Sequence, residues 1–423
     1  MSSTVEQADE GSRARAPVPG QKKRRLDHVD AMRPVKQAGV VGTHTLLAFA
    51  PGASIYVGAS LLLLHVTREA FLFVSACMLT YSYRTLRKGD WGRFYRRRFV
   101  SVGLPYLCWT VIYFFVTFAK AGPNAGAQIG HLGYLVISGY YQLYYLLVIM
   151  QFYVLFPLLL WLLRHTARHG RILLAGAAFQ VTLVALIHWQ VTPSFMQGFW
   201  ATREVTSYAF YLLAGAIVAL HLEEFHDWLL RHAREALAAT LAAATLAEAW
   251  FVFASHHLGG ALGSPSDPLQ PIVIPFNIGA IACVYLIGVY LVDPRRSARL
   301  GAIVRSGSDN SYGVYLSQMV FITLLGTLGW RRVTHVVPWP IVSVLTVVLV
   351  FCACVLLTAV LARTPLSVAL TGRQRESWRT FLPFGWGSEP SGEMGEDLSP
   401  ISLDQHAALL EPEAAVPAPA GRS

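Results

Sequence analysis

The chain alternates between long apolar stretches and short polar ones along most of its length. Runs of roughly 20 apolar residues without internal alternation are typical of helices that cross a membrane. We expect about ten such helices, at residues 34–52, 67–84, 97–119, 141–163, 172–189, 204–222, 236–255, 272–292, 311–330 and 338–362. Barrel strands alternate in polarity, so this pattern excludes a β-barrel. The predicted fold is therefore all-α, a polytopic transmembrane helical bundle.

The polar ends of the chain define its predicted domain organisation. Residues 1–32 are polar and include a run of four basic residues, and residues 372–423 are polar and acidic in their last part. Both compositions are typical of disorder. We expect a disordered basic tail over 1–32, a transmembrane domain over 33–371 and a disordered acidic tail over 372–423. Residues 53–66 either extend the first span or form a half-helix at the outer surface.

The distribution of charge predicts the topology. The chain is 54% hydrophobic and only 14% charged, with a net charge of +10, whereas soluble proteins carry about 25% charged residues. The basic residues lie mostly between apolar segments and gather in alternate loops. The positive-inside rule then places both termini in the cytosol and the protein in the plasma membrane, as a multi-pass protein. We expect no nucleic-acid partner.

Cysteine and metal-ligand patterns add no site. The five cysteines lie inside apolar stretches and none has CxxC spacing. They indicate small core residues, with neither a disulfide framework nor a metal site.

The first predicted span carries the strongest candidate for chemistry. Arg33 and His44 are eleven residues apart, which is about three helical turns plus roughly 20°, so both lie on one helix face about 16 Å apart. Arg33 then lies at the cytosolic interface and His44 about halfway through a core roughly 30 Å thick. An ionisable residue at that depth indicates function, and imidazole is suited to be a general base. The alternative is a histidine satisfied by a neighbouring helix.

Three further features permit more than one interpretation. Arg96-Arg97-Arg98 precedes the third span, and such a patch either binds phosphates or reflects topology and anionic lipid. The tyrosine-rich segment 140–145 is either an interfacial belt or a surface that stacks on a sugar ring. Glu248, inside the seventh span, is a proton-relay candidate in a transporter.

Several segments together resemble the membrane acyltransferase 3 family of bacterial O-acyltransferases. The first is Arg33-x10-His44, preceded by Asp30 and followed by Thr45. The stretch 71–84 (FLFVSACMLTYSYR) resembles the family's second span, and 94–109 (FYRRRFVSVGLPYLCW) resembles its arginine-rich start of the third span. There Arg98 fits the first position of an RxxR motif, whereas Ser101 replaces the second arginine.

Later segments continue the resemblance in the same order. The stretch 140–159 resembles the fourth span, with Gln142 in place of a frequent His and Tyr144 in place of Trp. The stretch 208–219 resembles a glycine-containing span, and 311–318 resembles a motif near the end of the domain, here with Gln318 in place of His. The resemblance covers roughly residues 25–363.

The resemblance implies an enzyme that moves an acyl group, usually acetyl, from cytosolic acyl-CoA to a hydroxyl. By resemblance His44 is the catalytic residue, as base or transient acyl carrier. Arg33 contacts the acyl-CoA, and Arg98 with Arg97 holds its phosphates. Asp30 is a structural, supporting residue of the site, and Tyr141, Gln142, Tyr144 and Tyr145 are candidate acceptor-binding residues. No cofactor is expected to be bound permanently, because acyl-CoA is the donor substrate.

More than one acceptor and more than one class of function remain open. A cell-envelope carbohydrate is the preferred acceptor, and a small secondary metabolite such as a macrolide is the alternative. About ten spans and Glu248 also permit a transporter of glycan or metabolite, and the incomplete RxxR motif permits a sensor or scaffold without catalysis. The partners expected in every enzymatic case are acyl-CoA, a hydroxylated acceptor and the lipid bilayer.

Overall fold

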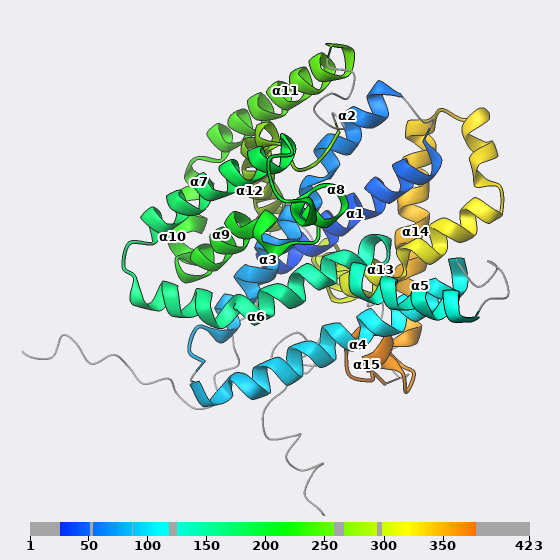
Figure 1. The fold of residues 1–423 in the computed structure, drawn as a ribbon, viewed down its shortest axis with the longest axis horizontal. Helices are drawn as coiled ribbons and strands as arrows, with labels where there is room; N and C mark the ends of the chain where they lie inside the picture. The colour runs from blue at the N-terminus through cyan, green and yellow to red at the C-terminus, as the bar shows by residue number, and fades with distance from the viewer. Residues whose placement is uncertain are drawn as a thin grey trace, which may run out of the picture.

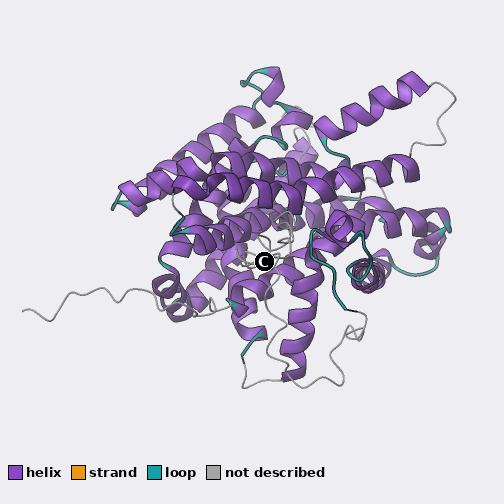
Figure 2. Cartoon of the chain, turned by 90° about the horizontal axis from the view of Figure 1, so that it is seen from below, coloured by secondary structure: helices purple, strands orange, loops and turns teal. Residues whose placement is uncertain are grey.

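The computed structural model describes residues 26–50, 54–86, 88–117, 125–257, 266–293 and 298–377. Within these ranges every regular element is a helix and there is no strand (Figure 2), which confirms the predicted all-α fold. The helices of ten or more residues are α1 (Asp27–Phe49), α2 (Ile55–Leu64), α3 (Val66–Tyr83), α4 (Trp91–Thr117), α5 (Ala125–Ser138), α6 (Tyr144–His165), α7 (His169–His188), α9 (Ala209–Leu220), α10 (Leu222–Arg231), α11 (Ala233–His257), α12 (Ile274–Leu291), α13 (Ala298–Thr327) and α14 (Trp339–Leu361).

Shorter helical turns connect the long helices. They are α8 (Gly198–Ala201), α15 (Ser367–Thr371) and six 3-10 turns: η1 (Lys88–Asp90), η2 (Tyr141–Leu143), η3 (Ser194–Met196), η4 (Val205–Tyr208), η5 (Pro271–Val273) and η6 (Trp330–His335).

Among the described residues, seven helical segments are long and apolar enough to cross a membrane, or eight if the sharply bent pair α9–α10 counts as one span. This supports a membrane protein but does not confirm ten spans. The predicted spans at 34–52 and 311–330 correspond to α1 and α13, which are outside this set. Both helices are less apolar than the seven segments, because they carry polar residues such as Lys36 and Gln37 in α1 and Asn310 and Gln318 in α13.

The polarity of the bundle is inverted relative to a water-soluble protein. Large apolar side chains such as Leu174 and Val344 are 72% and 65% exposed, whereas Lys36, Gln37 and Gln318 are at most 4% exposed. Lipid is as apolar as leucine, so a membrane domain exposes apolar side chains and directs polar ones inward. Helix α1 runs through the middle of the bundle, in contact with α3, α12, α13 and α14 (Figure 1).

The stretch 53–66 follows neither of the two predicted courses. Its described part forms α2, which continues through His65 into α3, so residues 55–83 are one apolar segment of 29 residues. Residues 51–53 are outside the described residues. Helix α5, which the sequence pattern did not predict, precedes α6 and shares an apolar segment with it over Gln128–His165.

A backbone contact fixes α3 against α9, the two helices in most extensive contact. Gly215 of α9 lies directly on the carbonyl oxygen of Phe73 in α3, so a Cβ there has no room. Small residues let helix backbones approach closely in membranes. This contact sets the register between the two helices.

The chain after α14 folds back onto α4. The indole nitrogen of Trp109 donates to the carbonyl oxygen of Leu370 at 2.8 Å. Gly372 has φ of 69° and lies on the carbonyl oxygen of Ser101, so it combines a left-handed conformation with a close approach that favours glycine. The next residue, Arg373, donates to the carbonyl oxygen of Asp309 in α13 at 3.1 Å. This segment thereby joins α4 to α13.

We expect Gly215→Ala to destabilise the bundle by about 1–3 kcal/mol, because the added methyl group forces α3 and α9 apart. Gly133→Ala is the matched control, since a Cβ at Gly133 in α5 meets nothing within 4 Å. Thermal unfolding of both variants in detergent checks the prediction. Equal midpoints for the two variants would contradict the proposed register contact.

Candidate functional site

Helix α1 presents a continuous polar stripe. The helix is unbroken from Asp27 to Phe49. The predicted spacing therefore holds, and Arg33 and His44 share a face. Gln37, seven residues before His44, lies on the same face because seven residues are roughly two turns. Gln37 is fully buried, and its amide makes no hydrogen bond with the described part of the chain. The stripe therefore runs from Arg33 through Gln37 to His44.

His44 lies against a tyrosine from η2. The rings of His44 and Tyr141 are 5.0 Å apart and tilted by 47°. The Nδ1 atom of His44 is buried and has no hydrogen-bond partner among the described residues. A buried ring nitrogen usually has a partner, so this atom is available to a ligand. The imidazole is thus placed beside an aromatic ring with one nitrogen uncommitted.

The backbone around Tyr141 is strained. Tyr141 has φ of 34°, and Gly139 two residues earlier has φ of 75°. A positive φ in a tyrosine costs on the order of 1–3 kcal/mol and persists only where the surroundings impose it. Tyr315 of α13 donates a hydrogen bond to the carbonyl oxygen of Gln142, which fixes the turn from the other side. Such strain is concentrated at functional sites.

The other candidate acceptor-binding residues lie at different depths. Gln142 is buried next to Tyr141. Tyr144 lies under the guanidinium of Arg203, whose Cζ is 4.8 Å from the ring centre. Tyr145 is buried, and its ring is 4.6 Å from that of Phe71. The structure thus places Tyr141 next to His44 and Tyr145 in the core.

The arginine end of α1 carries an ion pair. The Nη2 atom of Arg33 is 3.3 Å from the Oδ1 atom of Asp30, and both side chains are largely buried. Asp30 therefore holds Arg33 in place, as its spacing of one helical turn permits.

Arg98 lies against tyrosine rings of α3 and α6. The Cζ atom of Arg98 is 4.9 Å from the ring centre of Tyr83 and 6.0 Å from that of Tyr153. Its Nε atom is buried and has no hydrogen-bond partner among the described residues. Arg97 is partly buried and Arg96 is exposed. Of the three arginines, Arg98 has the surroundings of a ligand-binding group.

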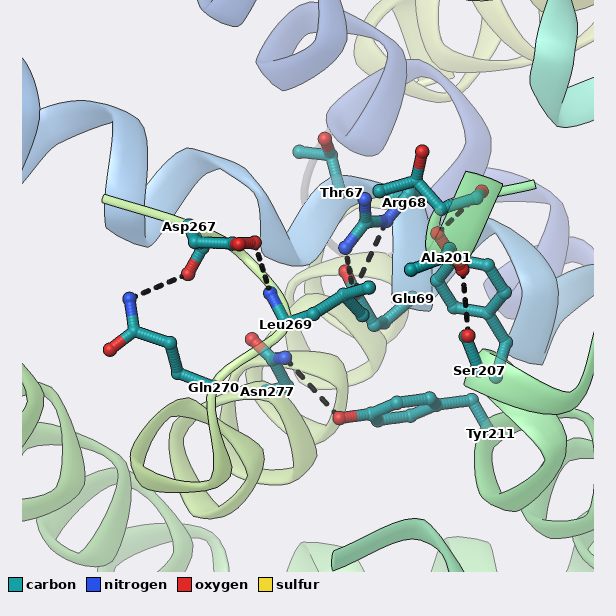
Figure 3. A network of polar contacts seen from close by, with 12 residues as sticks. Thr67, Arg68, Glu69, Ala201, Ser207, Tyr211, Asp267, Leu269, Gln270 and Asn277 are labelled. Carbon is teal, nitrogen blue, oxygen red and sulfur yellow. Dashed lines mark hydrogen bonds and ion pairs between the residues drawn. The ribbon is translucent and has the colours of Figure 1, made fainter. Parts of the chain in front are cut away.

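Sequence reasoning missed a buried ion pair at the start of α3. Figure 3 shows Arg68 reaching the Oε1 atom of Glu69, with Nη2 at 2.7 Å and Nε at 3.3 Å. The side chains are only 9% and 2% exposed. The predicted span 67–84 includes both residues, but neither was among the candidate site residues. The signal was available, because two adjacent charges inside an apolar segment are costly without a role.

A buried lysine was also missed. Lys36 of α1 is 4% exposed, and its Nζ atom lies 3.2 Å from the centre of the Phe71 ring. A cation over an aromatic face is a favourable arrangement where water is excluded. Lys36 therefore places an amino group on α1 between Arg33 and His44.

Glu248, the rival candidate, lies on α11, which packs chiefly on α12. It is partly exposed, and its Oε1 atom has no hydrogen-bond partner in the described chain.

Asn277 donates to the hydroxyl of Tyr211 at 3.2 Å (Figure 3).

Comparison with known proteins agrees with the resemblance seen in the sequence. Residues 28–359 match the acyltransferase 3 family model, which is described as an acyltransferase domain. Searches of curated proteins and of solved structures found no match. The family match covers α1 to α14 and includes the stripe of α1. The chain therefore belongs to the acyltransferase 3 family.

Proposed function

We propose that the protein is an integral-membrane O-acyltransferase that moves an acyl group, in the first instance acetyl, from acyl-CoA to a hydroxyl of a cell-envelope carbohydrate. The observation that carries this proposal is the arrangement on α1. Arg33 is held by Asp30 at one end, and His44 has an unpartnered buried Nδ1 atom beside Tyr141, eleven residues away. The family match supports the acyl-transfer class.

The charges support the binding of a donor that carries phosphates. Arg33 and Arg98 both lie partly buried, and the Nε atom of Arg98 has no partner in the described residues. Guanidinium groups bind phosphate oxygens through paired hydrogen bonds. We propose that Arg98, with Arg97, binds the phosphates and Arg33 the adjoining part of the donor. Lys36 and Gln37 then line the path of the thioester toward His44.

The chemistry at His44 follows from its position. The imidazole nitrogen takes the proton of the acceptor hydroxyl as the hydroxyl oxygen attacks the thioester carbonyl carbon. The carbon–sulfur bond breaks, and the proton passes from the imidazolium to the leaving thiolate. The products are an ester and free CoA. Tyr141 lines the acceptor side of the imidazole in this arrangement.

Topology is part of the same proposal. The positive-inside rule places both termini in the cytosol and the arginine end of α1 at the cytosolic face of the plasma membrane. The donor then reaches Arg33 and Arg98 from the cytosol, where acyl-CoA is made. The acceptor approaches His44 from the opposite side.

We expect His44→Ala to lose acyl transfer by a factor on the order of 10²–10⁴, the contribution of a general base, while the protein inserts and folds normally. The measurement uses purified protein in nanodiscs with radiolabelled acetyl-CoA and extracted cell-envelope glycans. The control is His256→Ala, since His256 is exposed on α11. Full activity of His44→Ala would refute the proposed role. Thioester turnover without labelled glycan would favour a small-metabolite acceptor.

We expect Arg98→Ala to raise KM for acetyl-CoA roughly tenfold, because one charged hydrogen-bonding group to phosphate is lost. The rate with S-acetyl-N-acetylcysteamine, a donor without phosphates, should not distinguish this variant from the unmodified protein. Steady-state kinetics with both donors provide the measurement, and Arg171→Ala, an exposed arginine of α7, is the control. An equal loss with both donors would assign Arg98 to packing instead of phosphate binding.

A further inference from the structure

Glu69 uses only one of its two carboxylate oxygens. Oε1 accepts both hydrogen bonds from Arg68, whereas Oε2 is buried and has no partner among the described residues. The residue is 2% exposed. A buried carboxylate normally satisfies both oxygens, because each unpaired lone pair costs free energy in an apolar setting. Oε2 is therefore an unfilled hydrogen-bond acceptor inside the bundle.

Aromatic and polar side chains lie near the Arg68–Glu69 pair. The Cζ atom of Arg68 lies 4.9 Å from the centre of the Tyr208 ring. Tyr208 and Tyr211 are both buried, and α9, which carries Tyr211, packs on α3. Asn277 points at the Tyr211 hydroxyl from α12 (Figure 3). A carboxylate, a guanidinium, an amide and two aromatic rings are groups that together suit a ring carrying several hydroxyls.

The pair is also close to the proposed reaction centre. Thr67, next to Arg68, lies directly on Gly39 of α1, five residues before His44. Phe71, two residues after Glu69, lies under the Nζ atom of Lys36 in α1, which is 3.2 Å from its ring centre. The Phe71 ring is also 4.6 Å from that of Tyr145, four residues after Tyr141, and Tyr141 lies against His44. The ion pair thus lies next to α1, the helix that carries His44.

We propose that Arg68 and Glu69 form the acceptor-binding subsite, which recognises an uncharged polyhydroxylated ring through hydroxyls adjacent to the one that is acylated. The inference rests on the proposed O-acyltransferase function and adds to it the residues that bind the acceptor ring. Glu69 Oε2 accepts a hydrogen bond from one ring hydroxyl, and the Arg68 guanidinium donates to a neighbouring oxygen. A bound ring held in this way presents a further hydroxyl to the imidazole of His44.

The experiment measures acylation of methyl glucopyranoside, galactopyranoside and mannopyranoside, and of their single-deoxy derivatives, by purified protein in nanodiscs with acetyl-CoA. We expect Glu69→Gln to raise KM for the preferred glycoside at least tenfold, with a smaller change in KM for acetyl-CoA. The unmodified protein should discriminate against the derivative that lacks the neighbouring hydroxyl, and Glu69→Gln should not. Glu69→Asp should recover part of the affinity.

Glu248→Gln is the matched control, a carboxylate in another apolar helix, and its acceptor KM should equal that of the unmodified protein. Four outcomes would overturn the subsite. They are an unchanged acceptor KM in Glu69→Gln, equal discrimination in both proteins, a parallel loss for donor and acceptor with a lower unfolding temperature, and thioester turnover with none of the glycosides acylated. Absence of thioester turnover even in the unmodified protein would instead refute the O-acyltransferase function.

Discussion

The architecture depends on the cost of placing polar side chains at membrane depth. Helix α1 carries a lysine, a glutamine and a histidine in its middle turns, and such a helix is stable in a bilayer only when other helices separate it from lipid. The neighbours α3, α12, α13 and α14 provide that separation. Their outward faces carry apolar side chains, and their inward faces pack on α1. A polar interior and an apolar exterior are thus two results of one constraint.

The same constraint explains how much could be predicted. Most predicted spans correspond to described helices, since lipid contact leaves a strong signal in the sequence. The shared face of Arg33 and His44 also followed from spacing, because an unbroken helix fixes it. The count of spans was not confirmed, because shielded helices such as α1 and α13 lose the apolar signal that identifies a span.

The parts that could not be predicted depend on contacts between distant segments. The two adjacent charges of Arg68 and Glu69 are visible in the sequence, but the contact with Tyr208 that helps to bury them is not. The position of Arg373 beside α13 depends on a glycine that fits against Ser101, more than 250 residues away in sequence. The conformation of Tyr141 depends on a hydrogen bond from α13. No local pattern encodes such pairings.

The contact between Gly215 and Phe73 also limits how the protein can move. Where two helix backbones are in direct contact, no side chain can change its rotamer at the contact. Such a contact therefore does not permit the small sliding motions seen between packed helices. We therefore expect helices α3 and α9 to move together, with Glu69 at a constant position relative to Tyr211. An opening that admits or releases a ligand is then expected at the helices on the other sides of α1.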